Sequence, residues 1–306
     1  MKQLLTSTPL LAIICCLLWG SSFVPTKLGL EFMPAPLQYA GYTFLVSGLL
    51  LLPWAGINRH LLSQFRHHGW IMLKVALFTT TILYGSYYLG QSMADGSLVA
   101  LIVSCQPFFV ALLAHWILRN ERFTPLMVFS LALCIIGMTV VSWPSFAGLH
   151  TLGYTSVIGI AFILIDCLSA AYGNIVVSRI DFTRVDIKVL TSAEMIIGGG
   201  LLLILAYPIE GIAPIPSDSL FYVSFSSMVF INTVTMIIWL RLLARPNTKV
   251  SHLNMWKFLI PITGSVECWT LLHNDSPTVY SVTGLVIIVT SLIIFHSYPR
   301  HTQIQD

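Results

Sequence analysis

The feature that most constrains this chain is a series of long apolar runs separated by short polar stretches. Each run holds about 20 mainly apolar residues, the length that an α-helix needs to cross a bilayer. Membrane β-strands are shorter and alternate apolar with polar residues, so the run length favours helices. We therefore predict ten spans, at residues 9–29, 36–56, 70–90, 97–118, 125–143, 153–177, 187–208, 219–242, 250–272 and 278–298.

The composition agrees with a chain that is solvated partly by lipid. Charged residues make up 9% of the sequence, whereas a soluble domain averages about 25%. The predicted class is an all-α polytopic membrane protein. A net charge of +3, spread along the chain, gives no reason to expect nucleic acid. The six cysteines lie in apolar segments without a CxxC pair, so we expect no metal and no cofactor.

The basic residues predict the orientation of the spans, because cytoplasmic connections carry an excess of Lys and Arg. The connections 91–96, 144–152, 209–218 and 273–277 contain neither residue type. The protein is predicted to lie in the plasma membrane or the bacterial inner membrane, and both of its termini are therefore predicted to be cytoplasmic. Thirteen of the 15 basic residues fall on that side, all except Lys27 and Lys257: Lys2, Arg59, Arg66, Lys74, Arg119, Arg122, Arg179, Arg184, Lys188, Arg241, Arg245, Lys249 and Arg300.

The two halves of the chain have similar residues at positions that are 154 residues apart. Five spans per half is an odd number, so residues 1–148 and 149–306 are predicted to form two inverted five-helix repeats, the arrangement that permits alternating access. A folding relic without a role in transport is the alternative. The matched positions are Ser97 and Ser251, Pro107 and Pro261, Glu121 and Asp275, Thr124 and Thr278, Ser130 and Gly284, and Gly137 and Ser291.

Several of these segments resemble the EamA-type transporters of the drug/metabolite transporter superfamily. The stretches WGSSF at 19–23 and KLGLE at 27–31 are similar to that family's first-span signature, and PFFVALL at 107–113 followed by ERFT at 121–124 to its fourth-span motif. Pro261, Asp275 and Gly284 are similar to the matching part of the second half. The resemblance implies a ten-helix inner-membrane transporter, often an exporter of amino acids, drugs or metabolites. Two departures are Gln38 near the start of span 2, where Arg is frequent, and Asp275, where Glu is usual.

Asp166, Glu194 and Lys257 lie deep inside predicted spans, where an ionisable side chain costs at least ~2.5 kcal/mol at mid-span. Asp166 is either an acid bonded to neighbouring helices or a proton-coupling acid or substrate-amine contact. Lys257 and Glu194 lie at similar depth and could pair with each other. Alternatively, Lys257 binds an anionic group of the substrate, and Glu194 is the second candidate coupling acid.

Polar and aromatic side chains add a candidate lining for a central cavity. Several share a helix face at a spacing of three, four or seven residues, although helix packing would explain any single face. Pro107 and Pro261 are candidate helix breaks beside a midplane site, with an ordinary kink as the alternative. The candidate cavity residues are Trp19, Ser22, Tyr84, Tyr88, Gln106, Asn232, Trp239, Asn254 and Lys257.

The function that these observations favour is secondary transport of a small metabolite by alternating access, with export as the favoured direction. Uptake or exchange is the alternative within the class, and a non-transporting receptor or assembly protein is the alternative outside it. No HExxH, GxSxG or Walker motif occurs, so we do not expect an enzyme. The expected partners are a small-molecule substrate and the lipid bilayer, with protons as a candidate coupling ion and a homodimer as a candidate assembly.

Overall fold

The computed structural model describes residues 7–56, 59–94, 99, 102–118, 124–146, 153–246, 248–271 and 277–297. The predicted boundary between residues 148 and 149 lies outside this set. So do Lys2, Ser97, Arg119, Glu121, Arg122, Asp275 and Arg300, on which parts of the predicted orientation and repeat rest.

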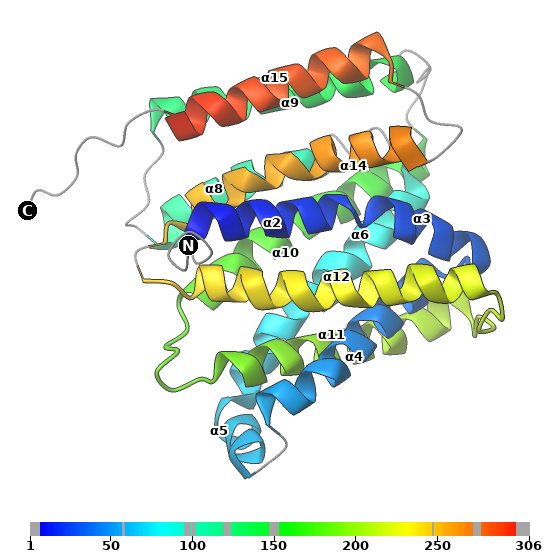
Figure 1. Ribbon diagram of the computed structural model, residues 1–306, viewed down its shortest axis with the longest axis vertical. Helices are drawn as coiled ribbons and strands as arrows, with labels where there is room; N and C mark the ends of the chain where they lie inside the picture. The colour runs from blue at the N-terminus through cyan, green and yellow to red at the C-terminus, as the bar shows by residue number, and fades with distance from the viewer. Residues whose placement is uncertain are drawn as a thin grey trace, which may run out of the picture.

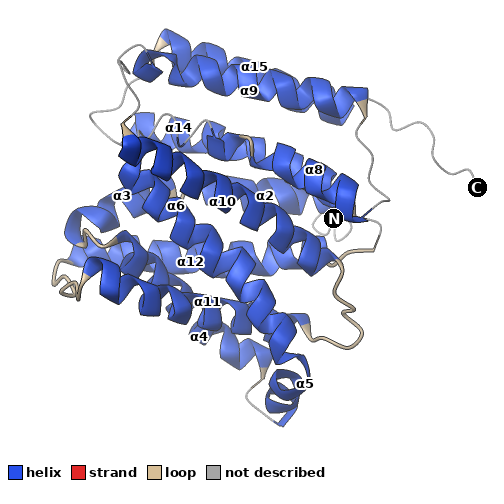
Figure 2. Cartoon of the chain, turned by 180° about the vertical axis from the view of Figure 1, so that it is seen from behind, coloured by secondary structure: helices blue, strands red, loops and turns tan. Residues whose placement is uncertain are grey.

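The described residues form helices and connections, and none of them forms a strand (Figures 1 and 2). The helix axes run roughly parallel or antiparallel to one another over most of the molecule (Figure 1), as is usual for apolar helices packed side by side in a membrane. The helices are α2 (Thr8–Gly20), α3 (Phe23–Phe32), α4 (Pro36–Ala55), α5 (Arg59–Ala76), α6 (Ile82–Met93), α8 (Gln106–Leu118), α9 (Pro125–Phe146), α10 (Tyr154–Ser178), α11 (Ile187–Glu210), α12 (Ser219–Leu243), α13 (Val250–Met255), α14 (Leu259–Leu271) and α15 (Val279–Ser297).

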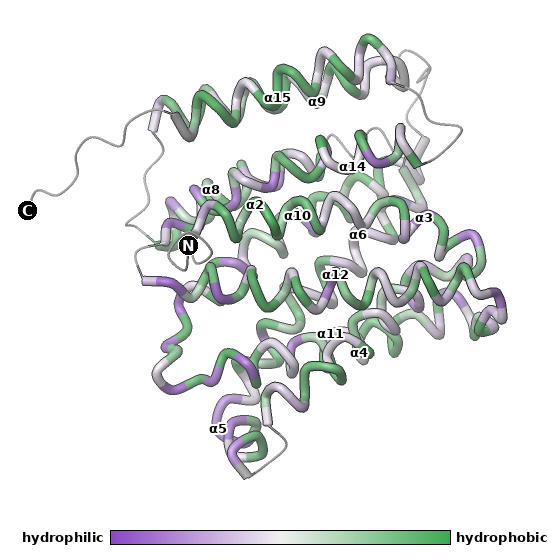
Figure 3. The backbone as a smooth tube through the Cα atoms, in the orientation of Figure 1, coloured by the Kyte–Doolittle hydropathy of each residue, from purple (hydrophilic) through white to green (hydrophobic). Residues whose placement is uncertain are grey.

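Five segments are long and apolar enough to cross a membrane, namely Thr8–Phe32, Pro125–Trp143, Tyr154–Ser178, Ile187–Glu210 and Ser219–Leu243. Two shorter apolar helices, Ile102–Leu118 and Val279–Phe295, accompany them. Figure 3 shows hydrophobic residues along α9 and α15, and a concentration of hydrophilic residues in α5 and in the connection between α10 and α11. The chain is therefore a multi-pass membrane protein, and the full count of ten spans stays a prediction.

The third predicted span is longer than its apolar run. Residues 57–69 were predicted as a polar connection, but α5 begins at Arg59, runs through this stretch, and continues through a π-helical turn, Leu77–Thr81, into α6. Leu61 and Phe65 are four residues apart and pack against the hydrophobic core. This spacing gives the stretch one apolar helical face, which explains why it is helical despite its polar composition.

Three further spans are interrupted, each where its residues reach the middle of the molecule. A turn at Ser21 and Ser22 separates α2 from α3, and a turn at Cys105 precedes α8. The segment after α13 is a 3₁₀ turn, Trp256–Phe258, which leads into α14. Interrupted backbone at membrane depth needs polar partners or a cavity beside it, so these breaks direct attention to the space between them.

Two long antiparallel helix contacts join the first half of the chain to the second. In one, α4 packs along α11; in the other, α9 packs along α15 as a separate outer layer (Figure 1). Both depend on small residues that let backbones approach. A Cβ atom built on Gly199 would lie 2.8 Å from the Gly41 carbonyl oxygen, and one built on Gly137 would lie 2.9 Å from that of Gly284. Close approach of this kind is the usual basis of helix association in membranes.

Candidate functional site

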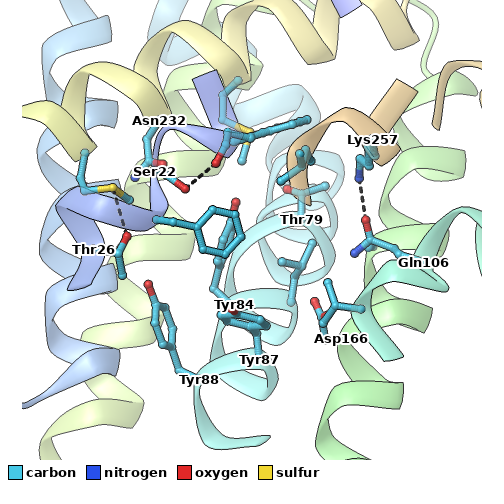
Figure 4. A pocket seen from close by; sticks show the side chains of 18 of the residues that line it. Ser22, Thr26, Thr79, Tyr84, Tyr87, Tyr88, Gln106, Asp166, Asn232 and Lys257 are labelled. Atoms are coloured by element: carbon cyan, nitrogen blue, oxygen red, sulfur yellow. Dashed lines mark hydrogen bonds between the residues drawn. The ribbon is translucent and has the colours of Figure 1, made fainter. Parts of the chain in front are cut away.

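A cavity of about 710 Å³ lies between the interrupted helices and is bounded by α2, α3, α6, α8, α10, α12 and the segment from the 3₁₀ turn to α14 (Figure 4). Pockets for small molecules usually measure about 300–1,000 Å³, so the space suits a metabolite. Eight of the nine candidate residues line it: Trp19, Ser22, Tyr84, Tyr88, Gln106, Asn232, Trp239 and Lys257.

The cavity is open at one end and closed at the other. Lys27, Glu31 and Gln91, near the ends of α3 and α6, line its mouth and are exposed. Leu240 and Leu243, at the opposite end of the lining, are 1% and 2% exposed. The mouth therefore faces the side that the basic residues predict to be non-cytoplasmic.

Lys257 is held at the wall of the cavity by an amide and two indole rings. Its Nζ donates to Oε1 of Gln106 at 2.8 Å. The same atom lies 5.5 Å from the ring centroid of Trp19 and 5.0 Å from that of Trp239. The two indoles meet edge to face, with their centroids 5.0 Å apart. A cation over aromatic faces is stabilised by their quadrupoles, most strongly when water is excluded.

A chain of amides fixes the orientation of Trp239. Its Nε1 donates to Oδ1 of Asn174 at 3.1 Å, and Nδ2 of Asn174 donates to Oδ1 of Asn254 at 3.0 Å. Asn254 in turn donates to the Val250 carbonyl oxygen at 2.9 Å. Asn254, the ninth candidate, is fully buried and lies outside the lining. It supports the wall from behind instead of contacting a solute.

Asp166 lines the cavity from α10 and is 1% exposed. Its Oδ2 atom has no hydrogen-bond partner. Within the described part of the chain, no ion pair joins it to Lys257; Figure 4 shows Gln106 between the two side chains. A buried carboxyl oxygen without a donor is costly, so the described residues leave this group unsatisfied at the cavity wall.

Glu194 differs from its predicted placement. It does not pair with Lys257 and lies outside the cavity lining. Instead, its Oε1 atom lies 2.8 Å from the hydroxyl oxygen of Thr79 and also within hydrogen-bond reach of that of Thr80. The position of Glu194 around the axis of α11 points its side chain toward the π-helical turn. The depth of a residue along a span does not determine which side of the helix it occupies.

The two candidate prolines lie immediately after changes in helix geometry. Pro107 follows the turn at Cys105, and Pro261 follows the 3₁₀ turn that contains Lys257. Pro261 lacks the N–H that would bond to the Lys257 carbonyl oxygen four residues earlier. A local change of helix type is the expected response.

Sequence reasoning missed several lining residues. Tyr87 lies beside Tyr88 on α6, with their ring centroids 5.4 Å apart. Its spacing of three residues from Tyr84 could have identified it. Asn174 could have been found as an amide in an apolar span. Met228 and Met236 on α12 gave no sequence signal, because methionine is an ordinary apolar residue in a span.

A multi-pass bundle of helices around a partly polar cavity is an architecture that membrane transporters have. Comparisons with known proteins agree with this class. Residues 6–143 match the EamA-like transporter family, so the first half of the chain is similar to that family.

The relatives resemble the chain over most of its length. It is 22% identical to the uncharacterized transporter YoaV of Bacillus subtilis, covering 89% of this chain and 90% of that protein. It is 26% identical to a probable amino-acid metabolite efflux pump of Escherichia coli, covering 93% of each. A protein of known crystal structure superimposes with a TM-score of 0.76 at 17% identity, covering 94% of this chain and 96% of the other, which shows a shared fold.

Proposed function

We propose that this protein is a secondary transporter that exports a small zwitterionic or amphipathic metabolite across the plasma or inner membrane by alternating access. The observation that carries the proposal is the central cavity, which is lined both by a carboxyl group with an unpartnered oxygen and by a fixed ammonium group. The relative of Escherichia coli named as a probable amino-acid metabolite efflux pump supports an amino-acid-like solute.

The charged groups support a solute with both signs of charge. Asp166 lacks a donor, so an ammonium or other hydrogen-bond donor on the solute would satisfy it. Lys257 contacts one amide oxygen and two ring faces, and an anionic group would add a charge-assisted bond. The wall built from Tyr84, Tyr87 and Tyr88 would contact the less polar body of the solute.

Alternating access by two inverted repeats is supported by the helix contacts of α9 with α15. A shift of 154 positions carries Ser130 to Gly284 and Gly137 to Ser291. If each residue is replaced by its counterpart in the other half, the close contact of Gly137 with Gly284 becomes a contact of Ser291 with Ser130. That second contact is present as well, since Ser291 Oγ donates to the Ser130 carbonyl oxygen at 2.7 Å.

The contact of α4 with α11 behaves in the same way. A shift of 151 positions carries Gly41 to Ser192 and Gly48 to Gly199. Exchange of the halves turns the contact of Gly41 with Gly199 into one of Ser192 with Gly48, and Ser192 Oγ donates to the Gly48 carbonyl oxygen at 2.9 Å. Any in-register antiparallel contact is exchanged in this way, so the support lies in which helices pair. α4 and α11 are the second predicted spans of their halves, and α9 and α15 are the fifth, as a pseudo-two-fold relation of the halves requires.

The test is transport by the purified protein in sealed liposomes, with and without a pH gradient. Candidate solutes come from an untargeted comparison of metabolites inside and outside cells with and without the gene. Export predicts that solutes accumulate inside cells lacking the gene; uptake predicts depletion. Gradient-driven accumulation indicates proton coupling, and gradient-independent counterflow indicates exchange. The proposal fails, in favour of a receptor or assembly role, if no metabolite changes distribution and none crosses the liposome membrane.

A further inference from the structure

The π-helical turn Leu77–Thr81 is clamped between two helices of the second half. On one side, Ser169 of α10 donates to the Phe78 carbonyl oxygen at 2.8 Å. A π-turn shifts the helical hydrogen-bond register and frees a carbonyl of this kind, so Ser169 supplies the partner that the helix lacks. On the other side, Thr79 and Thr80 contact Glu194 of α11. π-turns of this kind often lie at functional sites.

We infer that Glu194 carries a proton that holds this π-helical turn against α11, and that the proton exchanges with the cavity through Thr79. The inference concerns the proton site itself. Its use as the coupling ion of transport rests on the function proposed above.

The first argument is a count of hydrogens at Thr79. Its Oγ1 atom lies 2.8 Å from Oε1 of Glu194 and also 2.8 Å from the Val75 carbonyl oxygen. A hydroxyl has one hydrogen and can fill only one of two such contacts with acceptors. If Glu194 carries a hydrogen and donates it to Thr79, then Thr79 donates to Val75 and both contacts are filled. An ionised Glu194 leaves one of them as two facing oxygens.

The second argument is the surroundings of the carboxyl group. Glu194 is fully buried, and its Oε2 atom has no partner. Among the described residues, no Lys, Arg or His bonds to it. An ionised carboxylate would place part of its charge on that bare oxygen in apolar surroundings, whereas a neutral carboxyl leaves only an unpaired carbonyl oxygen.

The charged and titratable side chains of the neighbouring helices do not supply a positive charge that could stabilise an ionised Glu194. Tyr84 of α6 is the titratable side chain that faces Glu194. On the other elements packed against α11, the following titratable side chains bond or stack elsewhere: Tyr39 with Ser224, Tyr42 with Tyr207, His60 with Asp186, His67 with Ser63, His68 against His67, Lys74 over Tyr172, Tyr222 against Phe221, and Arg241 over Trp54.

The third argument is the route. Thr79 is 8% exposed, lines the cavity, and contacts Glu194 behind the cavity wall. When its own hydrogen turns from the Val75 carbonyl oxygen to cavity water, the hydroxyl can release that hydrogen to the water as it accepts the hydrogen of Glu194, and the reverse steps return the proton. Glu194 therefore reaches the cavity through one hydroxyl, although it does not line the cavity.

The proton site can be tested without a substrate by infrared spectroscopy of the full chain in vesicles of phosphatidylethanolamine and phosphatidylglycerol. The signal is the carbonyl stretch of a protonated carboxyl group at neutral pH. Glu194→Gln should remove one such band, and the matched variant Asp166→Asn should retain it. Thr79→Val should keep the band, shift it because the hydrogen loses its acceptor, and slow its hydrogen–deuterium exchange.

The outcomes separate the two proposals. The band shift in Thr79→Val identifies Glu194 even if Glu194→Gln fails to fold. An unchanged spectrum in Glu194→Gln, or an unshifted band in Thr79→Val, overturns the protonated state. Exchange at the wild-type rate in Thr79→Val overturns the route. Because no solute is used, none of these results depends on whether the protein transports the expected class of metabolite.

Discussion

The two charged residues at the cavity wall differ in how well the protein satisfies them. Lys257 has an amide acceptor and two aromatic faces, so its charge is stabilised before any solute enters. Asp166 lines the cavity, and its buried Oδ2 atom has no hydrogen-bond partner. A solute therefore gains the most binding free energy by donating a hydrogen bond to Asp166. The ammonium group of Lys257 then favours an anionic group elsewhere on the same solute.

Replacing Asp166 by Asn should weaken binding of amine-bearing solutes and lower their flux, while the protein still inserts. A charge-assisted hydrogen bond contributes about 1.5–3 kcal/mol, so the loss of affinity should be roughly 10- to 150-fold. Liposome flux with and without a pH gradient measures both effects, and Asp166→Glu is the charge-retaining control. Wild-type flux in Asp166→Asn would remove this residue from the mechanism.

Replacing Lys257 by Ala should weaken anionic and zwitterionic solutes by at least about tenfold, and neutral analogues much less, because the lost interaction is with negative charge. Lys257→Arg keeps the charge and should retain most of the preference. Competition by a matched series of charged and neutral analogues in the liposome assay measures the difference. Equal losses for both kinds of solute would assign Lys257 a structural role.

Helical spacing identified much of the candidate lining, because residues three, four or seven apart must share a face. That argument gathered Trp19 with Ser22 and Tyr84 with Tyr88. It could not say whether a face looks into a cavity or at another helix, which is why Asn254 supports Trp239 from behind. It also placed Glu194 beside Lys257 on depth alone, and only packing shows that Glu194 faces the π-helical turn.

At the scale of elements, the cavity is surrounded by helices that change geometry at mid-depth. The proline rule anticipated changes beside Pro107 and Pro261, because proline removes a helical donor. It could not anticipate the π-helical turn at Leu77–Thr81 or the break at Ser21 and Ser22. Those depend on partners such as Ser169 and Glu194, which are distant in sequence and adjacent only in the folded chain.

The contact of α4 with α11 should be sensitive to a single methyl group. A Cβ atom on Gly199 would lie 2.6 Å from the Leu45 backbone nitrogen, which cannot move independently, so Gly199→Ala should destabilise the protein by about 1–3 kcal/mol. A Cβ atom on the adjacent Gly200 meets nothing within 4 Å. Gly200→Ala should therefore be neutral or slightly stabilising, by up to about 1 kcal/mol.

Thermal unfolding of both alanine variants in the same detergent measures this difference, with the wild-type protein alongside. The two substitutions add the same atoms to neighbouring positions of one helix, so helix propensity and detergent binding cancel between them. Equal melting temperatures for the two variants would mean that the close packing of α4 on α11 does not contribute to stability.

At the scale of the molecule, the cavity is open where α3 and α6 end and closed by Leu240 and Leu243. The distribution of Lys and Arg predicts that the open end is non-cytoplasmic. The first statement comes from the packing and the second from the sequence, and together they predict an outward-facing state. An exporter must then close this mouth and open the opposite end for the next solute.

Cysteine labelling tests that orientation directly. In a variant without the six native cysteines, Gln91→Cys at the mouth should react with a membrane-impermeant maleimide in intact cells. Ser22→Cys, deeper in the cavity, should react from the same side more slowly, because the reagent must enter the mouth. Lys249→Cys, after α12, should react only once the cells are permeabilised. Labelling of Lys249→Cys in intact cells, with Gln91→Cys protected, would reverse the assigned orientation and with it the direction in which the cavity faces.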